Sequence, residues 1–232
     1  WDNIPIVKLI EDRYHVKAGL QNDANACAMA EWKFGATKGH DNVIFLTFGT
    51  GMGSGLILDG HLYAGTNDNA GEVGHVSLSE QGPVGYGKRG SFEGYCSGGG
   101  IAQLATTKAL EMFEMNQKPS FCDNVNSIHD ISAKDVAMKA LEGKEDALEV
   151  YETSGRYLGR ALSLLIDILN PEMIVIGSIF ARSGELLIPA MEKEIAKEAL
   201  PLASNVCKIV PAELGENLGD YAALSIASYI VS

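Results

Sequence analysis

The sequence predicts an α/β fold in which helices pack on a mixed sheet. The apolar run at residues 173–176, followed by Gly177, is typical of a strand buried on both faces. Residues 42–48 and 53–58 are two further apolar stretches joined by a short glycine-rich turn, which predicts a hairpin. Helical patterns alternate with strands behind this hairpin, and that order indicates the α/β class.

The composition narrows the possible functions. The chain has 232 residues, of which 46% are hydrophobic and 21% are charged, so it can bury a substantial core. Its net charge is −12 and no basic run is longer than Lys88-Arg89, so we expect no nucleic acid binding. No run of about 18 apolar residues occurs, which predicts no membrane span. Four scattered cysteines without a leader favour reduced thiols and a cytoplasmic location.

The first part of the chain leads to a candidate ligand-binding position. The sequence begins at Trp1 without an initiating Met, and we expect further residues upstream. Residues 5–14 have helical apolar spacing, and residues 17–21 are a candidate strand. The alanine-rich residues 24–36 predict a strong helix. Asp23 would then lie between a strand end and a helix start, where α/β proteins commonly bind ligands.

A long glycine-rich loop follows the hairpin. Asp59-Gly60 predicts a turn, and residues 61–63 predict the start of another strand. Residues 64–93 contain many Gly, Asn and Ser residues and have little periodicity. Loops of this length in a compact domain are usually functional.

The second half of the chain alternates between helices and strands. Helices are expected at residues 97–114, 132–141, 144–169, 183–199 and 218–230. Ser132 is the expected N-cap of the second helix, and Asn170-Pro171 ends the third. Strands are expected at residues 173–177 and 207–211.

The octapeptide Phe-Gly-Thr-Gly-Met-Gly-Ser-Gly at residues 48–55 has glycine at every second position from 49 to 55. Glycine permits close approach of the backbone to a ligand, so this turn could direct N–H groups at a phosphate, with Thr50 adding a hydroxyl. The same glycines could instead serve only the geometry of a hairpin. The octapeptide alone leaves both interpretations open. It is not a Walker A loop, because the Gly-Lys-Ser/Thr ending is absent.

Four polar residues around this turn have ordinary structural explanations when each is taken alone. Asp23 could be a helix cap. Glu72 and His75 could be solvated loop residues, and they make a poor metal site without a third ligand. Glu93 could be a solvated carboxylate. Taken together, carboxylates and a histidine can hold the hydroxyls of a sugar beside a phosphate-binding turn, as a sugar kinase requires.

The motifs resemble those of the ROK family, which comprises repressors, open reading frames and sugar kinases. The resemblance rests on three motifs: Asn22-Asp23-Ala-Asn25-Ala26, Gly-Thr-Gly-x-Gly at residues 49–53, and Gly71-Glu72-Val-Gly-His75. It extends in order along nearly the whole chain to residues 218–223. It implies a two-lobed actin/hexokinase-like (ribonuclease H-like) fold and a homodimer. Residues 1–21 would end the small lobe, residues 22–215 would form the large lobe, and residues 216–232 would form a closing helix.

The resemblance also implies roles for individual residues. Asp23 would be the catalytic base that accepts the proton of the sugar 6-hydroxyl, with Asn22 beside it on the sugar. Glu72, His75 and Glu93 would bind the other sugar hydroxyls. The residues implied for ATP, used with Mg²⁺, are Gly49, Thr50, Gly51, Gly53 and Gly177.

The sequence departs from the family pattern in two places. Many members bind zinc through a histidine and a Cys-x-Cys-Gly-x-x-Gly-Cys segment, but the corresponding cysteine positions here are Val84, Tyr86 and Ser91. We therefore predict no structural zinc and no metal ligands, with the loop held by packing of residues such as Val84, Tyr86 and Phe92. The family segment Asp-x-Gly-Gly-Thr, which contacts ATP phosphates, would lie upstream of this sequence. We therefore expect low activity from this chain alone.

The leading functional hypothesis is an ATP-dependent, glucokinase-like hexose kinase. An N-acetylmannosamine or N-acetylglucosamine kinase is a close alternative. A sugar-sensing transcriptional repressor, whose DNA-binding domain would lie upstream, is the competitor from another class. Asp23 and the intact glycine turn favour the kinase, because a sensor needs no catalytic base.

Overall fold

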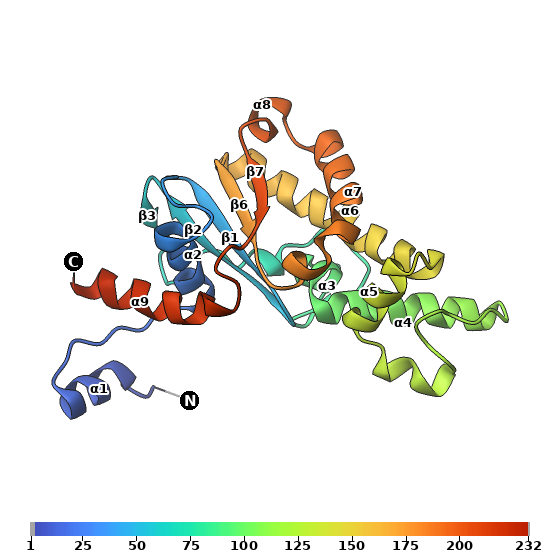
Figure 1. Cartoon of the computed structure of the whole chain (residues 1–232), viewed down its shortest axis with the longest axis horizontal. Coiled ribbons are helices and arrows are strands. Elements are labelled where there is room, and N and C mark those ends of the chain that lie inside the picture. The colour runs from blue at the N-terminus through green and yellow to red at the C-terminus, as the bar shows by residue number, and fades with distance from the viewer. Residues whose placement is uncertain (1–2, 232) are drawn as a thin grey trace.

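A five-stranded mixed sheet organises the computed structural model, which describes residues 3–231 (Figure 1). The strands lie in the order β3-β2-β1-β6-β7. The strands β1, β2 and β3 form an antiparallel meander, and β6 and β7 continue the sheet parallel to β1. Their bounds are Val43–Phe48 (β1), Met52–Leu58 (β2), His61–Leu62 (β3), Met173–Ile176 (β6) and Lys208–Pro211 (β7). The predicted mixed α/β fold is confirmed.

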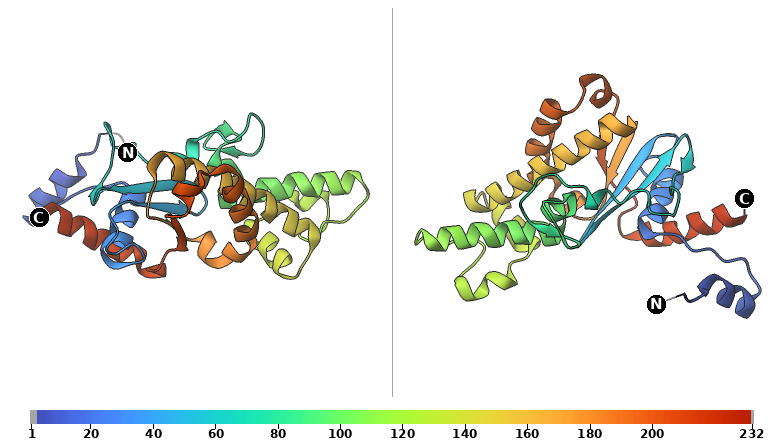
Figure 2. Two further views of the ribbon diagram at one scale, coloured as in Figure 1. Left: turned by 90° about the horizontal axis from the view of Figure 1, so that it is seen from above. Right: turned by 180° about the vertical axis from the view of Figure 1, so that it is seen from behind.

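Side chains of β1 alternate between two cores on opposite faces of the sheet. Ile44, Leu46 and Phe48 enter the larger core, whereas Val43 and Phe45 enter the smaller one. Helices that contribute to the larger core are α3 (Phe92–Cys96), α4 (Gly98–Glu114), α5 (Ala133–Leu141), α6 (Glu145–Leu169) and α7 (Ile179–Glu198). The smaller core is covered by α2 (Asp23–Phe34) and α9 (Leu218–Val231), so the sheet lies between two helical layers (Figure 2).

The N-terminal helix α1 (Ile6–Tyr14) has no buried residue and lies apart from the sheet (Figure 1). Its position agrees with the predicted helix at residues 5–14. The strand predicted at residues 17–21 is wrong, because this segment passes α9 and pairs with no strand. Gly19 lies so close to α9 that a Cβ added at this position would be 1.9 Å from Cδ1 of Ile230.

A buried carboxylate joins α2 to the chain before α9. Glu31 is fully buried, and its Oε2 accepts a 2.8 Å hydrogen bond from the Ala36 backbone N–H. Its Oε1 accepts a 3.0 Å bond from the Leu214 N–H, on the approach to α9. Hydrogen bonds are needed to compensate for burying a charged group. Glu31 therefore fixes α2 against the C-terminal part of the chain.

The long loop contains short elements that the sequence did not reveal. They are a 3₁₀ turn η1 (Val73–His75) and a small hairpin of β4 (Val84–Gly85) and β5 (Lys88–Arg89). Helix α3 follows directly. These elements are too short to produce periodicity, and long-range contacts stabilise them instead.

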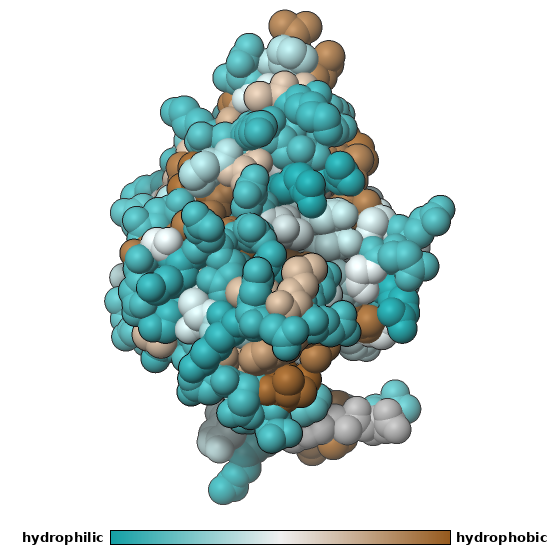
Figure 3. Space-filling model, turned by 90° about the vertical axis from the view of Figure 1, so that its right-hand side faces the viewer, coloured by the Kyte–Doolittle hydropathy of each residue, from teal (hydrophilic) through white to brown (hydrophobic). Residues whose placement is uncertain are grey.

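Most other predicted elements are confirmed, with α7 as the main exception. It begins at Ile179, four residues before the predicted start, and it is kinked at Ser183, where φ is −137°. The sequence also did not reveal η2 (Val125–Asp130), α8 (Pro201–Ser204) and η3 (Gly215–Asn217). Within residues 3–231, none of the helices combines the length and apolar character needed to cross a bilayer. The end of the molecule over α4 and α5 is largely hydrophilic (Figure 3).

Candidate active site

Helix α2 begins at the site, and the residue that caps it is Asn22. Its Oδ1 accepts hydrogen bonds of 2.9 Å from the Ala24 N–H and 3.2 Å from the Asn25 N–H. Asp23 is the first helical residue and is exposed. Its Oδ1 also accepts from the Ala24 N–H at 2.8 Å, and within residues 3–231 no hydrogen bond engages its Oδ2. The cap interpretation of Asp23 is therefore wrong, since its neighbour performs that function.

The glycine turn is the tip of the β1–β2 hairpin. The Gly49 N–H donates to the Gly51 carbonyl across the turn at 3.1 Å. Within the described part of the chain, the N–H groups of Thr50 and Gly51 donate to no protein acceptor. The turn is thus a hairpin and also presents two free backbone donors. The hairpin interpretation of the octapeptide is confirmed, and it is compatible with the phosphate-binding interpretation, which stays a prediction.

The remaining glycines of the octapeptide serve packing. A Cβ at Gly55 would lie 2.5 Å from the Ala24 carbonyl oxygen, so Gly55 allows α2 to lie directly on β2. The Gly53 N–H donates to Thr47 Oγ1 at 2.8 Å. By contrast, a Cβ at Gly49 would meet nothing within 4 Å.

The turn η1 carries Glu72 and His75 and packs against β2. Gly71 has a φ of +91°, and its carbonyl accepts from both the N–H and the hydroxyl of Ser54. A Cβ at Gly74 would lie 2.3 Å from the Met52 carbonyl oxygen. Because both glycines permit this close approach, the Glu72 and His75 side chains lie beside the hairpin tip, exposed to solvent.

Glu93 approaches the hairpin tip from α3. Its Oε2 accepts a 2.9 Å hydrogen bond from the Met52 N–H and lies close to Gly51. The interpretation of Glu93 as only a solvated carboxylate is therefore wrong. Helix α3 is fixed in turn by Ser91, whose hydroxyl accepts from the Gly94 N–H at 3.1 Å as the N-cap.

The polar residues line two adjoining cavities that share Met52 and Glu72. The first, of about 360 Å³, is lined by Asn22, Asp23, the hairpin tip and Ser178. The second, of about 460 Å³, is lined by Asn69, His75, Tyr86 and Glu93. The structure thus brings together Asn22, Asp23, Glu72, His75 and Glu93, the five residues expected at the sugar. We call the first the base cavity and the second the hydroxyl cavity.

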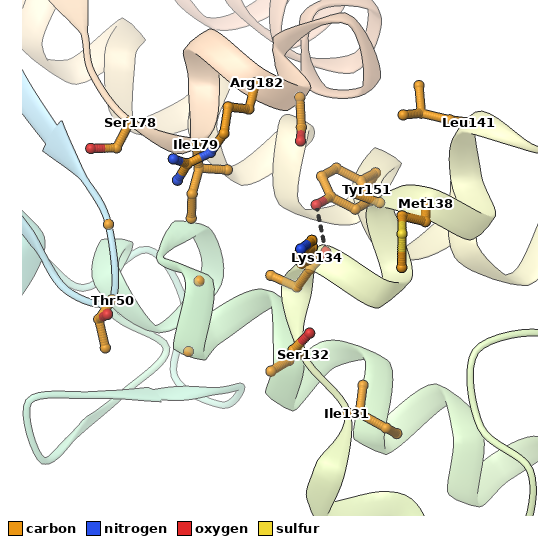
Figure 4. A pocket seen from close by; sticks show the side chains of 17 residues that line it. Thr50, Ile131, Ser132, Lys134, Met138, Leu141, Tyr151, Ser178, Ile179 and Arg182 are labelled. Atoms are coloured by element: carbon orange, nitrogen blue, oxygen red, sulfur yellow. Dashed lines mark hydrogen bonds between the residues drawn. The ribbon is translucent and has the colours of Figure 1, made fainter. Parts of the chain in front are cut away.

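A third and larger cavity, of about 780 Å³, lies on the other side of the hairpin tip. It shares Gly49, Thr50 and Ser178 with the base cavity. Figure 4 shows its walls: Thr50 lies at the hairpin tip, Ser178, Ile179 and Arg182 come from the start of α7, and Ser132 and Lys134 come from the α5 region. Its lining also includes the apolar residues Ile131, Ala137, Met138, Leu141 and Ile179.

The mouth of this third cavity favours an anion. Helix α4 begins there with Gly98 and Gly99, and α7 begins there after Ser178, whose side chain does not cap the helix. Helix N-termini carry a partial positive charge and N–H groups without intrahelical partners. At α4 the Gly98 N–H already donates to the Gly49 carbonyl and the Gly100 N–H to Ser97 Oγ, which leaves the Gly99 N–H. The charged side chains in the lining are Lys134 and Arg182, both cationic. The cavity therefore suits a ligand with a negatively charged end and a flat apolar end.

One predicted nucleotide-binding residue lies beside this cavity. Gly177 does not line it; its N–H donates to the Leu46 carbonyl at 2.9 Å and extends the ladder between β1 and β6. The next residue, Ser178, lines both the third cavity and the base cavity, with a φ of 50°. The sequence analysis overlooked Ser178, although its place directly after a buried strand was an available signal. It also overlooked Lys134 and Arg182, which lie far apart in sequence.

The loop positions that align with zinc-binding cysteines have other contacts. Ser91 is buried and caps α3, as described above. Tyr86 is 89% exposed and Val84 is 37% exposed, so the expectation that they hold the loop by packing is wrong. Phe92 is buried as expected. The loop is instead closed by hydrogen bonds, among them Lys88 Nζ to the His75 carbonyl (2.7 Å) and Gln103 to both the N–H and the carbonyl of Val84. Residues 3–231 contain no cluster of three or more potential His, Cys, Asp or Glu metal ligands.

Comparison with known proteins agrees with this geometry. A family model described as the ROK family matches residues 1–229. The chain is 30% identical over its whole length to the xylose repressor of Bacillus subtilis, of which it covers 55%. It is 32% identical over 94% of its length to the glucokinase of Halalkalibacterium halodurans, of which it covers 66%. The chain thus spans only part of the length of these curated relatives.

A solved structure of a ROK family protein has a similar fold. The ROK family glucokinase from Streptomyces griseus, in complex with glucose and AMPPNP, superposes with a TM-score of 0.78 at 27% identity. The match covers 99% of this chain and 74% of that protein. The expected actin/hexokinase-like fold is therefore confirmed.

Proposed function

Because the chain belongs to the ROK family, we propose that it phosphorylates a hexose at its 6-hydroxyl with ATP and that Asp23 is the general base. The observation that carries this proposal is the shared lining of the three cavities. Asp23 lines the base cavity, which adjoins the hydroxyl cavity through Met52 and Glu72 and the third cavity through Gly49, Thr50 and Ser178.

The hydroxyl cavity would hold the sugar ring. Glu72, His75 and Glu93 offer acceptors and donors for several hydroxyls, as a polyhydroxylated ligand requires. Glu93 already accepts from the Met52 N–H through Oε2, which leaves Oε1 for the sugar. The 6-hydroxyl would enter the base cavity, where Asp23 accepts its proton as the oxygen attacks phosphorus.

The third cavity fits ATP. Its apolar lining would hold the adenine ring, and its mouth would hold the phosphates through the Thr50 N–H group and the starts of α4 and α7, with the Gly51 N–H available from the adjoining base cavity. These donors would stabilise the negative charge that develops in phosphoryl transfer. Mg²⁺, when bound with the nucleotide, would neutralise phosphate charge.

A coupled assay tests this proposal directly. Glucose, mannose, N-acetylglucosamine and N-acetylmannosamine would be offered with ATP, to the chain alone and to the chain with any upstream residues that its gene encodes. ADP release that depends on one sugar supports the proposal and identifies the substrate among the hexose and N-acetylhexosamine alternatives. The absence of sugar-dependent ADP release from every form would overturn it.

The second candidate is a sugar-sensing repressor. It is favoured by the match to the xylose repressor, which covers the whole of this chain. Such a protein would use the hydroxyl cavity without phosphoryl transfer. Sugar binding without turnover, together with sequence-specific DNA binding by a longer form of the chain, would establish it.

We also propose that residues 1–21 and 216–232 pack with a small lobe, that residues 22–215 form the large lobe, and that the chain forms a homodimer.

A further inference from the structure

Tyr86 occupies an unusual position for an aromatic residue. It is the first of two residues that connect β4 to β5, and both have positive φ, 45° at Tyr86 and 76° at Gly87. Such two-residue turns favour Asn, Asp or Gly at the first position, because a bulky side chain is strained there. Backbone strain of this kind tends to persist where the residue has a function.

Tyr86 stands at the edge of the hydroxyl cavity. The residue is 89% exposed, yet it lines this cavity together with Glu72, His75 and Glu93. It lies against His75 in an edge-to-face arrangement, with ring centroids 6.3 Å apart and planes at 77°. An aromatic ring that is not buried in the core thus stands at the rim of a polar cavity.

The chemistry of a pyranose explains this combination. Its hydroxyls project around the edge of the ring, whereas its C–H groups form apolar faces. Glu72, His75 and Glu93 satisfy the hydroxyls but offer nothing to an apolar face. Binding sites usually combine a few placed polar groups with apolar or aromatic walls, and the face of an aromatic ring packs well against C–H groups.

We propose that Tyr86 is a sugar-binding residue that stacks its ring on a C–H face of the pyranose. The proposal rests on the proposed sugar site. It assigns Tyr86 to one wall of that site. Tyr86 thus makes the site selective for pyranoses whose C–H face is unobstructed.

The test is binding of D-glucose, measured by isothermal titration calorimetry, to four forms of the chain. Tyr86→Asn removes the ring and suits the turn better, so its melting temperature should stay equal or rise while the Kd for D-glucose rises about three- to tenfold. Tyr86→Phe keeps the ring and should remain within about twofold of the unaltered Kd. Tyr63→Asn is the matched control, because Tyr63 is 52% exposed and lines none of the three cavities, and its Kd should not change.

The outcomes separate this proposal from the proposed function. Unchanged glucose affinity in Tyr86→Asn would overturn the stacking role and leave the kinase intact. A weakened Tyr86→Phe would also overturn it, since the hydroxyl would then be the group required. Ring-dependent glucose binding without phosphorylation, in a form that also carries any upstream residues that its gene encodes, would support the role of Tyr86 and reject the kinase. If D-glucose does not bind, the sugar among the four that does bind replaces it in the comparison, and failure of every form to bind any of the four sugars would reject both.

Discussion

The carboxylate of Glu93 supports the hairpin tip: its Oε2 lies 2.9 Å from the backbone nitrogen of Met52, whose N–H donates to it. Met52 lines both the base cavity and the hydroxyl cavity, and Glu93 lines the hydroxyl cavity. One carboxylate therefore fixes the turn beside the proposed nucleotide site and also lines the cavity of the proposed sugar site. This double contact predicts that the two functions of Glu93 can be separated by substitution.

Glu93→Ala should weaken sugar binding by about tenfold and lower the free energy of unfolding by about 1 kcal/mol, because the Met52 N–H loses its acceptor. Glu93→Gln retains an oxygen acceptor and should recover most of the stability but not the sugar affinity. Urea unfolding and glucose titration of both variants measure the two effects. Equal stability of Glu93→Ala and the unaltered chain would show that the hydrogen bond contributes nothing.

Asp23→Asn should lower kcat by about 10²–10⁴-fold with little change in sugar affinity, because a general base contributes by that order. The neighbouring residue, Asn22, tests the capping of α2 separately from the role of Asp23. Asn22→Ala removes the cap of α2 and should lower the free energy of unfolding by about 1 kcal/mol. Steady-state kinetics and thermal unfolding of each variant measure these effects. Activity of Asp23→Asn within a few-fold of the unaltered enzyme would remove Asp23 from the mechanism.

The alternating glycines should divide into two groups when each is changed to alanine. Gly55→Ala should unfold at a markedly lower temperature, because its Cβ would lie 2.5 Å from the Ala24 carbonyl oxygen. Gly49→Ala should fold normally, since a Cβ there meets nothing within 4 Å, but it should raise the KM for ATP. Gly219→Ala, also with open space around it, is the control for the substitution itself. A destabilised Gly49→Ala would contradict this division.

The Glu172 carboxylate, which accepts hydrogen bonds from the residues before β1, should make the stability of the fold fall at acid pH. The N–H groups of Asn42 and Asp41 donate to the Glu172 carboxylate and hold its pKa below the ordinary value. A depressed folded-state pKa stabilises the fold above the unfolded pKa, about 4.3, and this contribution is lost as the pH falls through the folded pKa. Melting temperatures of the unaltered chain should therefore fall more between pH 6 and pH 3 than those of Glu172→Gln. Parallel curves would exclude the effect.

Purified protein should contain far less than one zinc per chain, and EDTA should leave its melting temperature unchanged. The reason is that Val84, Tyr86 and Ser91 stand where the family pattern given in the sequence analysis has cysteines. Elemental analysis of protein grown with zinc is the measurement. Stoichiometric zinc, or a fall in melting temperature with EDTA, would contradict this expectation.

The local sequence pattern was sufficient to predict helices and strands that bury a regularly spaced set of apolar side chains. Residues 173–176 are buried on both sides of the sheet, so their apolar run indicated a strand. The local sequence pattern did not predict the structure of segments whose conformation is determined by contacts with residues far away in sequence. Residues 17–21 have the composition of a strand but meet α9. Glu93 resembled a surface carboxylate, because nothing near it in sequence reveals the Met52 amide 41 residues away.

The candidate site was also predicted only in part from the sequence. Motif order grouped Asp23, Glu72, His75 and Glu93, and the structure brings all four to adjoining cavities. Lys134 and Arg182 were missed because their cavity forms only when α5 and α7 meet. Tyr86 was assigned to packing because its turn conformation, which turns the residue outward, could not be recognised from two residues of sequence.

The hydrogen bond from Leu214 to Glu31 also affects the order in which the molecule can assemble. Its two residues are 183 positions apart, so during synthesis the helix that begins at Asp23 exists long before its partner has been made. Until then one oxygen of Glu31 must remain hydrated, and α2 cannot complete its packing. Contacts between residues so far apart in sequence form late, because closing a long loop costs conformational entropy. A nascent chain that stops short of Leu214 would thus have its catalytic motifs but lack the contact that fixes the helix carrying them.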